Sequence, residues 1–262
     1  MQPLFDGDVL TYEIGFAAEH GWQGEGIPVF DYVEELLTQR IDNIAAMVGA
    51  NQPPLIYLTG DNNFRFSVAK TKPYKGNRDD SKRPFHYTNI RNYLMNVYRA
   101  ELVHNMEADD MLAIVQVSRL KDKDTIICTR DKDLRQVPGW HYSWELGKQP
   151  EWGPVFVEEN PGTLLNKNGK VTGTGLKWFY CQMLTGDTID NIPGLPSIGP
   201  AKAFKILSGC NTHEDIFKAV RNEYRKKYRE GWRTMMLEQG RLLWMCREVD
   251  KHNKPKMWEL PY

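Results

Sequence analysis

The chain has 262 residues, which is enough for one large domain, or a domain with a subdomain, around a well-buried core. No run of about 18 apolar residues predicts a membrane span, and the N-terminus lacks a charged-then-apolar secretion signal. We therefore expect a cytoplasmic protein with no membrane contact. Its four cysteines are widely spaced without a C-x-x-C pair, so we expect buried free thiols rather than a zinc site or disulfides.

The formal net charge is zero, with 34 basic and 34 acidic residues. Taken alone, that balance argues against a nucleic-acid partner. Nine of the acidic residues, however, fall in short motifs described below, and without them 34 positive charges would face 25 negative ones. A net charge of zero is therefore compatible with an acidic pocket in a basic surface.

Strands and helices are predicted to alternate through the first half of the chain. Apolar runs and helical periodicity predict strands at 3–6, 55–58, 102–103 and 125–128 and helices at 12–18, 32–48, 87–97 and 107–120. This order is typical of a doubly wound, mostly parallel α/β sheet. In such sheets, sites form beyond the carboxyl ends of the strands. Asp6, Asp61 and Asp131 each follow a predicted strand, so we expect them to meet at one edge.

The second half of the chain begins irregularly and ends in helices. Residues 138–174 are rich in tryptophan, and Asn168-Gly169 predicts a hairpin turn. The tryptophans of this region are expected either to pack in the core or to frame a substrate (Trp140, Trp144 and Trp152). A helix is predicted at 175–184, and residues 214–248 are predicted to be helical and basic. That basic stretch is either a second contact with nucleic-acid backbone or a solvated face.

One stretch, residues 185–207, combines acids with turn residues and a helix start. Asp187 and Asp190 stand three residues apart, a spacing that places both on one side of a helical turn. Glycines and prolines that favour turns follow them, and a short helix with Lys202 and Lys205 comes next. Because backbone N–H groups at a helix N-terminus bind phosphate, we expect metal on one side of this stretch and nucleic-acid backbone on the other.

Each acidic motif alone is explained as well by a turn or a helix cap, but together they predict a metal site. The acids concerned are Asp6, Asp61, Glu107, Asp109, Asp110, Asp131, Asp133, Asp187 and Asp190. Two like charges about 4 Å apart repel by roughly 4 kcal/mol at an effective dielectric near 20, so the cluster needs cations. Oxygen ligands without histidine or cysteine suit Mg²⁺ or Mn²⁺, not Zn²⁺. Two such ions can activate water and stabilise the leaving oxygen of a phosphodiester.

Five segments of the chain carry a family resemblance. In order, they are residues 5–8 (F-D-G-D), 74–78 (Y-K-G-N-R), 107–110 (E-A-D-D), 129–134 (T-R-D-K-D-L) and 186–194 (G-D-T-I-D-N-I-P-G). Together they resemble the flap endonuclease/5′-nuclease superfamily. The D-G-D start and the ending Q-G-R-L-L…W-E-L-P are similar to the 5′→3′ exonucleases of short-tailed phages. The resemblance covers residues 4–260.

The resemblance implies a PIN-like 5′-nuclease core at 1–185 with a basic arch within 64–99. Residues 186–262 would form a helix–three-turn–helix subdomain and C-terminal helices. It also implies ligands: Asp6, Asp61, Asp110 and Asp131 around a first Mg²⁺ with Glu107 and Asp109 beside it, and Asp133, Asp187 and Asp190 at a second. A K⁺ ion bound by carbonyls of the helix–three-turn–helix is a further expectation. Asp8 has no counterpart in many members and is left out.

The resemblance implies that Lys75 and Arg78 clamp the scissile phosphate. The predicted DNA contacts are Tyr74, Lys82, Arg83, Gly194, Gly199, Lys202 and Lys205. Tyr74 either stacks on a base or packs on the arch, and Lys82 and Arg83 thread or steer the strand. Pro200 departs from the family pattern and removes one donor N–H from the turn.

These features predict a metal-dependent 5′→3′ exonuclease or flap-type endonuclease for primer removal or DNA degradation in phage replication and recombination. The expected partners are duplex DNA with a free 5′ end or a 5′ flap, an RNA/DNA hybrid, and a replication polymerase. We expect the protein to be a monomer. Two alternatives are a PIN-type ribonuclease and a structure-specific DNA-binding protein without catalysis.

Overall fold

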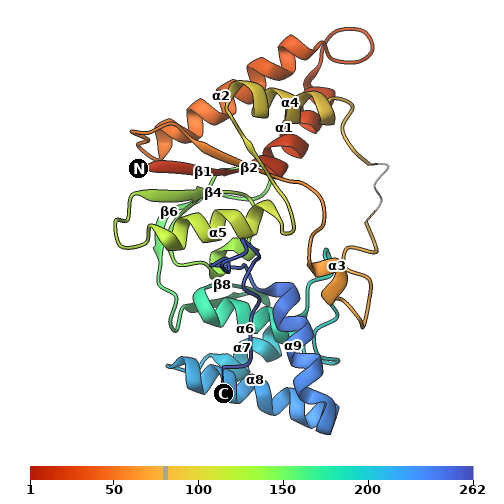
Figure 1. Cartoon of the computed structure of the whole chain (residues 1–262), viewed down its shortest axis with the longest axis vertical. Coiled ribbons are helices and arrows are strands. Elements are labelled where there is room, and N and C mark those ends of the chain that lie inside the picture. Colours follow the sequence, from red (N-terminus) through yellow and green to blue (C-terminus); the bar gives the residue numbers. More distant parts are fainter. Residues whose placement is uncertain (79–81, 262) are drawn as a thin grey trace. The chain divides into compact units, whose positions relative to one another are not determined.

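The structure is a computed structural model that describes residues 1–78 and 82–261. Within the basic arch predicted at 64–99, residues 79–81 lie outside the described part, as does residue 262. The chain divides into two compact units (Figure 1). The first unit comprises Met1–Asn62, Asp79–Lys132 and Gly139–Phe156, and the second comprises Asn63–Arg78, Asp133–Pro138 and Val157–Tyr262.

The first unit is built on a six-stranded sheet in the order β3-β2-β1-β4-β5-β6. Its strands are β1 (Gln2–Asp6), β2 (Leu55–Thr59), β3 (Glu101–Val103), β4 (Thr125–Cys128), β5 (Gly139–Ser143) and β6 (Trp152–Val157). The pairs β1–β2, β1–β4, β2–β3 and β4–β5 are parallel. The central strands β1 and β4 are buried at every position except Gln2, as expected for strands covered on both faces.

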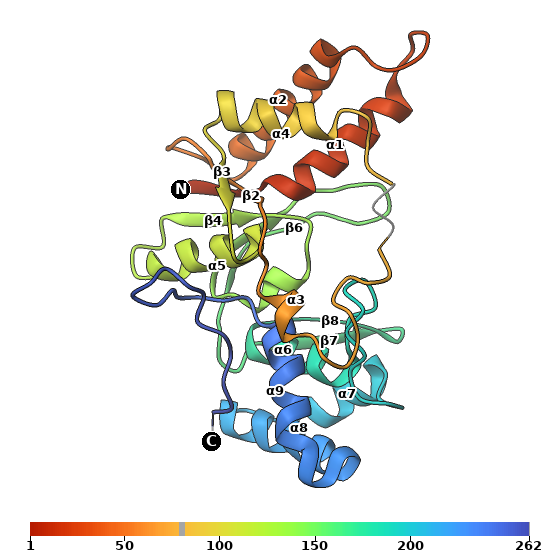
Figure 2. The same cartoon turned by 45° about the vertical axis from the view of Figure 1, so that its right-hand side comes forward.

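Helices cover both faces of this sheet. Figures 1 and 2 show α1 (Gly7–Gly21), α2 (Phe30–Met47) and α4 (Tyr87–Val97) on one face and α5 (Ala108–Ser118) on the other. The apolar stripe of α2, which includes Val33, Leu37 and Ile41, is buried in the core of the first unit. Burial of that stripe explains why its helical periodicity was visible in the sequence.

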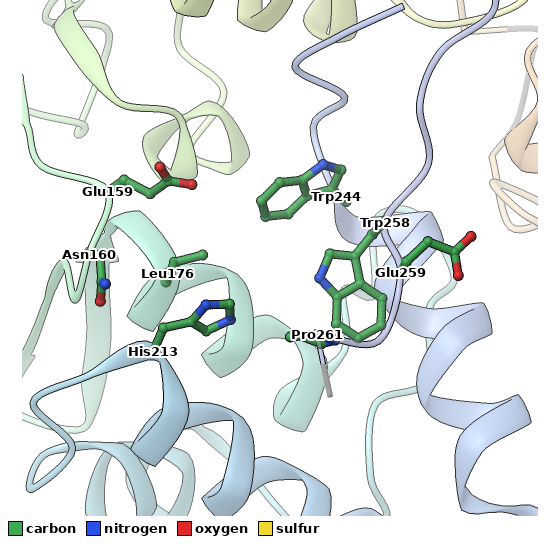
Figure 3. Close-up of a pocket in the computed structure, with 8 residues that line it drawn as sticks. All are labelled: Glu159, Asn160, Leu176, His213, Trp244, Trp258, Glu259 and Pro261. Atoms are coloured by element: carbon green, nitrogen blue, oxygen red, sulfur yellow. The ribbon is translucent and has the colours of Figure 1, made fainter. Parts of the chain in front are cut away.

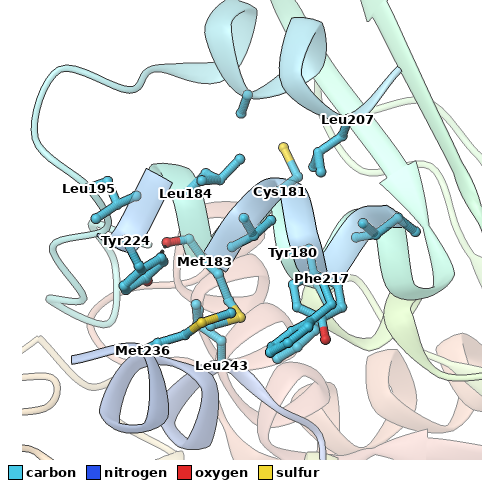
Figure 4. Packing of buried hydrophobic residues seen from close by; sticks show 14 of the residues in the cluster. Tyr180, Cys181, Met183, Leu184, Leu195, Leu207, Phe217, Tyr224, Met236 and Leu243 are labelled. Atoms are coloured by element: carbon cyan, nitrogen blue, oxygen red, sulfur yellow. Dashed lines mark hydrogen bonds between the residues drawn. The ribbon is translucent and has the colours of Figure 1, made fainter. Parts of the chain in front are cut away.

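The second unit is mainly helical. Its elements are α3 (Arg65–Val68), η1 (Asp133–Gln136), the hairpin β7 (Thr163–Lys167) and β8 (Lys170–Thr174), α6 (Gly175–Thr185), α7 (Pro200–Leu207), α8 (His213–Tyr228), η2 (Arg229–Gly231) and α9 (Trp232–Leu243). Nine of the 11 residues of α6 are buried, so this helix is the centre of the unit. Figure 4 shows Tyr180, Met183 and Leu184 of α6 packed with Tyr224 of α8 and Met236 of α9.

The doubly wound, mostly parallel sheet is confirmed, and so is the hairpin turn at Asn168-Gly169, where both residues have positive φ angles. The helix predicted at 87–97 and the strand predicted at 125–128 have the observed bounds. All four cysteines are free and buried, as predicted. In the described part of the chain, no helix is both long enough and apolar enough to cross a membrane.

Three features differ from expectation. The two units do not divide at residue 185, because α6 and residues 63–78 pack with the C-terminal helices in the second core. The helical stretch 214–248 is two helices separated by η2, and it ends at Leu243. Strands β5 and β6 lie in the region expected to be irregular. Trp144 of this region is buried in the first core, which is one of the two roles predicted for it.

Candidate metal centre and nucleic-acid interface

The nine predicted acidic ligands divide between the units. The first unit holds Asp6, Asp61, Glu107, Asp109, Asp110 and Asp131, and the second holds Asp133, Asp187 and Asp190. Among residues 1–78 and 82–261, no group of three or more histidine, cysteine or acidic side chains is arranged to hold a metal ion.

Asp6 is the buried acid at the carboxyl end of the central strand β1. One of its oxygens accepts the Val9 N–H at 3.0 Å and so caps α1, and the other accepts the Thr129 hydroxyl at 2.9 Å. The next residue must be glycine, because a Cβ at Gly7 would lie 2.7 Å from the carbonyl oxygen of Tyr57. The Asp-Gly pair thus fixes a carboxylate where strand, helix and neighbouring strand meet.

The pKa of Asp6 is raised to about 7, mainly by burial and then by the negative charges of Asp8 and Asp131. The hydrogen bonds from Val9 and Thr129 act in the opposite direction without cancelling these effects. A carboxylate whose charge is so poorly compensated is one that a bound cation would stabilise. The residues present therefore fit a hard divalent cation in their donor chemistry as well as in their charge.

Asp131 is connected to Asp6 through Thr129. The Asp131 N–H donates to the Thr129 hydroxyl oxygen at 3.0 Å, while that hydroxyl donates to Asp6. Threonine at 129 was not among the predicted site residues. The sequence offers no signal for it beyond its place one residue after β4.

The acids at 107–110 form the N-terminus of α5. Asp110 is fully buried, and its side chain accepts the backbone N–H of Glu107 at 3.1 Å. The Ala108 N–H donates to the Thr59 hydroxyl at 2.9 Å, which ties this helix start to the end of β2. Asp110 is thus a helix cap within a set of carboxylates, so the capping interpretation and the ligand interpretation are compatible.

Asp61 differs from the other acids of the first unit because its side chain is 72% exposed. It pairs with the imidazole of His104, and the hydrogen bond from His104 holds the pKa of Asp61 below its usual value. The strand-end pattern therefore placed Asp61 on the expected edge of the sheet but did not reveal its histidine partner.

Asp8, which the prediction left out, is engaged by Arg91 of α4. The Arg91 guanidinium donates to Asp8 at 2.6 Å and to the Thr59 carbonyl at 2.7 Å, while the Thr59 N–H donates to Asp8 at 3.0 Å. This pair joins α1, α4 and the end of β2 beside Asp6. The pairing between residues 83 positions apart is set by tertiary structure and leaves no local pattern in the sequence.

In the second unit, Asp187 and Asp190 lie on a turn that follows α6. The turn is closed by mutual hydrogen bonds between the backbones of Asp187 and Ile192, so the acids do not lie on a helix as their spacing had suggested. Gly186 and Gly194 have φ angles of +73° and +63°, and a Cβ on either would lie within 2.3 Å of backbone atoms. Glycine is therefore obligatory at both ends of this turn.

Asp187 and Asp133 are both held by hydrogen bonds. Asp187 is buried, and its carboxylate accepts the Ile189 N–H at 2.7 Å. Asp133, the first residue of η1, accepts a hydrogen bond at 2.6 Å from the side-chain amide of Gln182 on α6. Gln182 was not predicted to belong to the site.

Asp190 is in contact with the predicted phosphate clamp. Its carboxylate accepts hydrogen bonds from Arg78 at 2.6 Å and from the Tyr74 hydroxyl at 2.8 Å, and its carbonyl accepts the Lys75 N–H at 3.0 Å. Tyr74 is only 4% exposed, and the Lys75 ammonium lies 5.0 Å from the centre of its ring. Of the two roles considered for Tyr74, the structure favours packing over base stacking.

The predicted helix–three-turn–helix ends in α7. Gly199 caps this helix, and Pro200 occupies its first position, where proline costs no helical hydrogen bond. The proline that departs from the family pattern is therefore compatible with the start of α7. Lys202 and Lys205 are exposed on α7, whereas Gly194 is buried and has a conformational role.

Lys82 and Arg83 belong to the first unit. Arg83 is exposed, and its guanidinium lies 4.9 Å from the centre of the Tyr87 ring at the start of α4.

The second unit also contains a pocket of about 350 Å³. Figure 3 shows Glu159, Trp244, Trp258 and His213 around it. None of the predicted site residues lines this pocket, so it is separate from the acids and the clamp.

No family model matches the chain. Among curated proteins it is similar to DNA polymerase I of Geobacillus stearothermophilus, with 26% identity over 259 residues, covering 94% of this chain and 28% of the polymerase. It is also similar to DNA polymerase I of Deinococcus radiodurans, with 32% identity over 115 residues, covering 44% of this chain and 11% of the polymerase. The chain therefore spans less than a third of the length of these relatives.

Among solved structures, the chain resembles bacteriophage T5 flap endonuclease in complex with DNA and metal ions. The TM-score is 0.59 at 16% identity, covering 92% of this chain and 89% of the other. It also resembles T5 5′-exonuclease with bound zinc, with a TM-score of 0.53 at 16% identity, covering 90% and 88% of the two chains. At these identities the likeness shows the fold, which is the 5′-nuclease fold expected from the sequence.

Proposed function

We propose that the protein is a divalent-metal-dependent 5′→3′ nuclease that hydrolyses phosphodiester bonds in DNA as an exonuclease or a flap-type endonuclease. The observation that carries this proposal is Asp6, a buried carboxylate with a pKa near 7 at the carboxyl edge of a sheet with the 5′-nuclease fold. Buried acids whose charge is not compensated cluster at functional sites.

Each unit would hold one Mg²⁺, or Mn²⁺ in its place. The ligands of the first would be Asp6, Asp61, Asp110 and Asp131, with Glu107 and Asp109 beside them, and those of the second would be Asp133, Asp187 and Asp190. When bound, such ions activate water and stabilise the leaving oxygen of a phosphodiester. The acids need no histidine, cysteine or serine nucleophile for this chemistry.

Lys75 and Arg78 would act on the phosphate itself. Their segment is bonded to the turn that carries Asp190, and the Arg78 guanidinium pairs with that proposed ligand. The side chain of Arg78 is 47% exposed and is therefore accessible to a phosphate. Donors fixed in this way stabilise the negative charge that develops on phosphate oxygens during cleavage. Lys82 and Arg83 would steer the 5′-ended strand.

Duplex DNA would bind at α7. The helix N-terminus at Gly199 offers backbone N–H groups to a phosphate, and Lys202 and Lys205 add positive charge on the same helix. A K⁺ ion bound by carbonyls of the turn would strengthen this contact, which predicts tighter duplex binding in KCl than in NaCl.

The relatives suggest a role in replication. They are named DNA polymerase I, and this chain matches 28% of one and 11% of the other. We infer that it acts as a monomer on the 5′ ends that a replication polymerase meets, removing primers, including RNA in a hybrid, or degrading DNA during phage replication and recombination.

A cleavage assay tests this function. A 5′-labelled flap, a blunt duplex and a single-stranded RNA are each incubated with the protein in Mg²⁺ or in EDTA, with Asp187→Asn as the inactive control. We expect short 5′ products from both DNA substrates in Mg²⁺ only. Cleavage of RNA alone would indicate a PIN-type ribonuclease, and tight duplex binding without cleavage would indicate a DNA-binding protein.

A further inference from the structure

The segment that carries Lys75 and Arg78 has little structure of its own. Residues 63–78 contain one helical turn, α3, and most of the residues after it are exposed. Figures 1 and 2 both show α3 and the chain after it beside α9. At its start, the buried Arg65 donates to the carbonyls of Leu242 and Trp244 at the end of α9, at 3.0 and 2.8 Å. The position of the clamp therefore depends on contacts with the rest of the second unit.

At its far end, the same segment is bonded to the turn that carries Asp190. The Asn77 amide donates to the Thr188 carbonyl at 2.7 Å, and the Asn191 amide donates to the Pro73 carbonyl at 2.8 Å. Together with the contacts of Tyr74, Lys75 and Arg78 to Asp190, these bonds set the clamp against the turn.

Between these two ends, the segment is anchored by one side chain, Glu238 of α9. One of its oxygens accepts the N–H groups of Lys70 at 2.8 Å and Thr71 at 2.7 Å, and the other accepts the Thr71 hydroxyl at 2.9 Å. Glu238 is 9% exposed, and no cation among the described residues forms an ion pair with it. A nearly buried carboxylate is stable only when hydrogen-bonded, so Glu238 and the loop at 70–71 stabilise each other.

The two residues after Glu238 contact other parts of the second unit. The Gln239 amide donates to the Gly194 carbonyl at 3.4 Å, and Gly240 lies against the Trp258 ring, where a Cβ would approach to 2.3 Å. Consecutive helical residues point about 100° apart. Helix α9 therefore contacts residues 70–71 through Glu238 and, on another side, contacts Gly194 through Gln239. In this way α9 fixes the spacing between the segment that carries Lys75 and Arg78 and the turn that carries Asp187 and Asp190.

We propose that Glu238 is a positioning residue that holds Lys75 and Arg78 at the correct distance from Asp187 and Asp190. This role rests on the proposed nuclease function. Without Glu238, residues 70–73 lose their anchor, while the DNA-binding helix α7 keeps its contacts. Because a misplacement of about 1 Å can lower a rate about 100-fold, we expect a loss of rate without a loss of duplex binding.

The test compares Glu238→Ala, Glu238→Gln and the matched control Glu230→Ala, which removes an exposed carboxylate from η2. Glu238→Ala should lower the single-turnover cleavage rate by about 10- to 100-fold, with duplex affinity in Ca²⁺ within about twofold of wild type. Glu238→Gln should recover most of the rate, because its amide oxygen still accepts the two backbone N–H groups. Glu230→Ala should behave as wild type.

Two further measurements separate positioning from general stability. Amide hydrogen exchange at Lys70 and Thr71 should be faster in Glu238→Ala, and exchange in α7 should be unchanged. Thr71→Val removes only the hydroxyl donor at the exposed side of the contact and should lower the rate by about threefold, since it deletes one of three hydrogen bonds.

Specific outcomes would overturn the proposal. Wild-type cleavage rates in Glu238→Ala would show that the anchor does not position the clamp. Equal losses of rate, duplex affinity and thermal stability, with no effect of Thr71→Val, would show a purely structural role. A wild-type protein that cleaves no substrate would overturn the proposed nuclease function, and this role with it. A wild-type protein that cleaves, with a Glu238→Ala variant that cleaves equally fast, would overturn this role alone.

Discussion

Replacing Asp6 by asparagine is expected to stabilise the metal-free protein at pH 8 while abolishing metal-dependent cleavage. The pKa of this carboxyl is raised from 3.8 to about 7, mainly by burial and then by the charge of Asp8. A shift of about three pKa units corresponds to roughly 4 kcal/mol, which is the cost of ionising Asp6 in the folded protein at pH 8.

The sign follows from proton binding. Between about pH 4 and pH 7, the folded protein binds the Asp6 proton more tightly than the unfolded chain does. The free energy of unfolding of the wild type therefore falls as pH rises through this window and becomes level above it. Asparagine does not ionise, and its oxygen still accepts the Val9 N–H. It loses one acceptor for the Thr129 hydroxyl, a cost of about 1 kcal/mol. The net gain is about 3 kcal/mol at pH 8 and below about 1 kcal/mol at pH 5.

Urea unfolding in EDTA at pH 5, 6, 7 and 8, followed by tryptophan fluorescence, measures this gain. Asp122→Asn is the control, since it removes an exposed acid of the first unit and should change stability by less than about 0.5 kcal/mol. Mn²⁺ at pH 8 should stabilise the wild type more than Asp6→Asn, because the variant lacks a ligand. An Asp6→Asn advantage that is the same at pH 5 and pH 8 would refute the reasoning.

Three further predictions concern the second unit. Arg78→Ala should lower the cleavage rate by two or more orders of magnitude, with duplex affinity nearly unchanged in Ca²⁺, because in the proposed function Arg78 acts on the scissile phosphate and does not bind the duplex. Equal losses of rate and affinity would mean that Arg78 only binds DNA. Lys202→Ala and Lys205→Ala should each reduce the slope of log affinity against log salt concentration by about 0.9, because each removes one phosphate contact. Fluorescence anisotropy on a duplex measures this slope, and an unchanged slope would show that the lysine does not contact DNA. Gly194→Ala should destabilise the second unit by about 2–4 kcal/mol in urea unfolding, because the alanine Cβ would lie 2.2 Å from the Gly186 nitrogen. A change below about 0.5 kcal/mol would show that this position does not require glycine.

The sequence predicted those elements whose patterns are local. The strand at 125–128 and the helix at 87–97 were found because an apolar run and a 3.6-residue period depend only on neighbouring residues. The strand β5 was missed because its buried residues include His141 and Ser143, which do not form an apolar run. The boundary between the units was missed for another reason: α6 precedes the acidic turn in the chain but buries its side chains against α8 and α9.

The candidate site shows the same limit. Asp6 and Asp131 were predicted because the carboxyl ends of parallel strands share an edge, which is a rule of topology. Their partner Thr129, the Arg91 that engages Asp8, and the Gln182 that binds Asp133 were not predicted. These contacts join residues from 49 to 123 positions apart, and no period or spacing in the sequence records such a pairing.

The two units balance the charge of their acids in different ways, and the difference bears on how cations would bind. In the first unit, Asp6 keeps a pKa near 7 because its two hydrogen bonds do not offset burial and the charges of Asp8 and Asp131. Binding of a cation there would relieve the repulsion between Asp6 and these charges. Below neutral pH, however, the cation would compete with a proton for the Asp6 carboxylate. In the second unit, Asp190 already accepts hydrogen bonds from Arg78 and Tyr74. A cation at Asp190 would therefore compete with an arginine that is charged at every working pH, and an Arg78 displaced from the carboxylate would be available to the phosphate that we propose it binds.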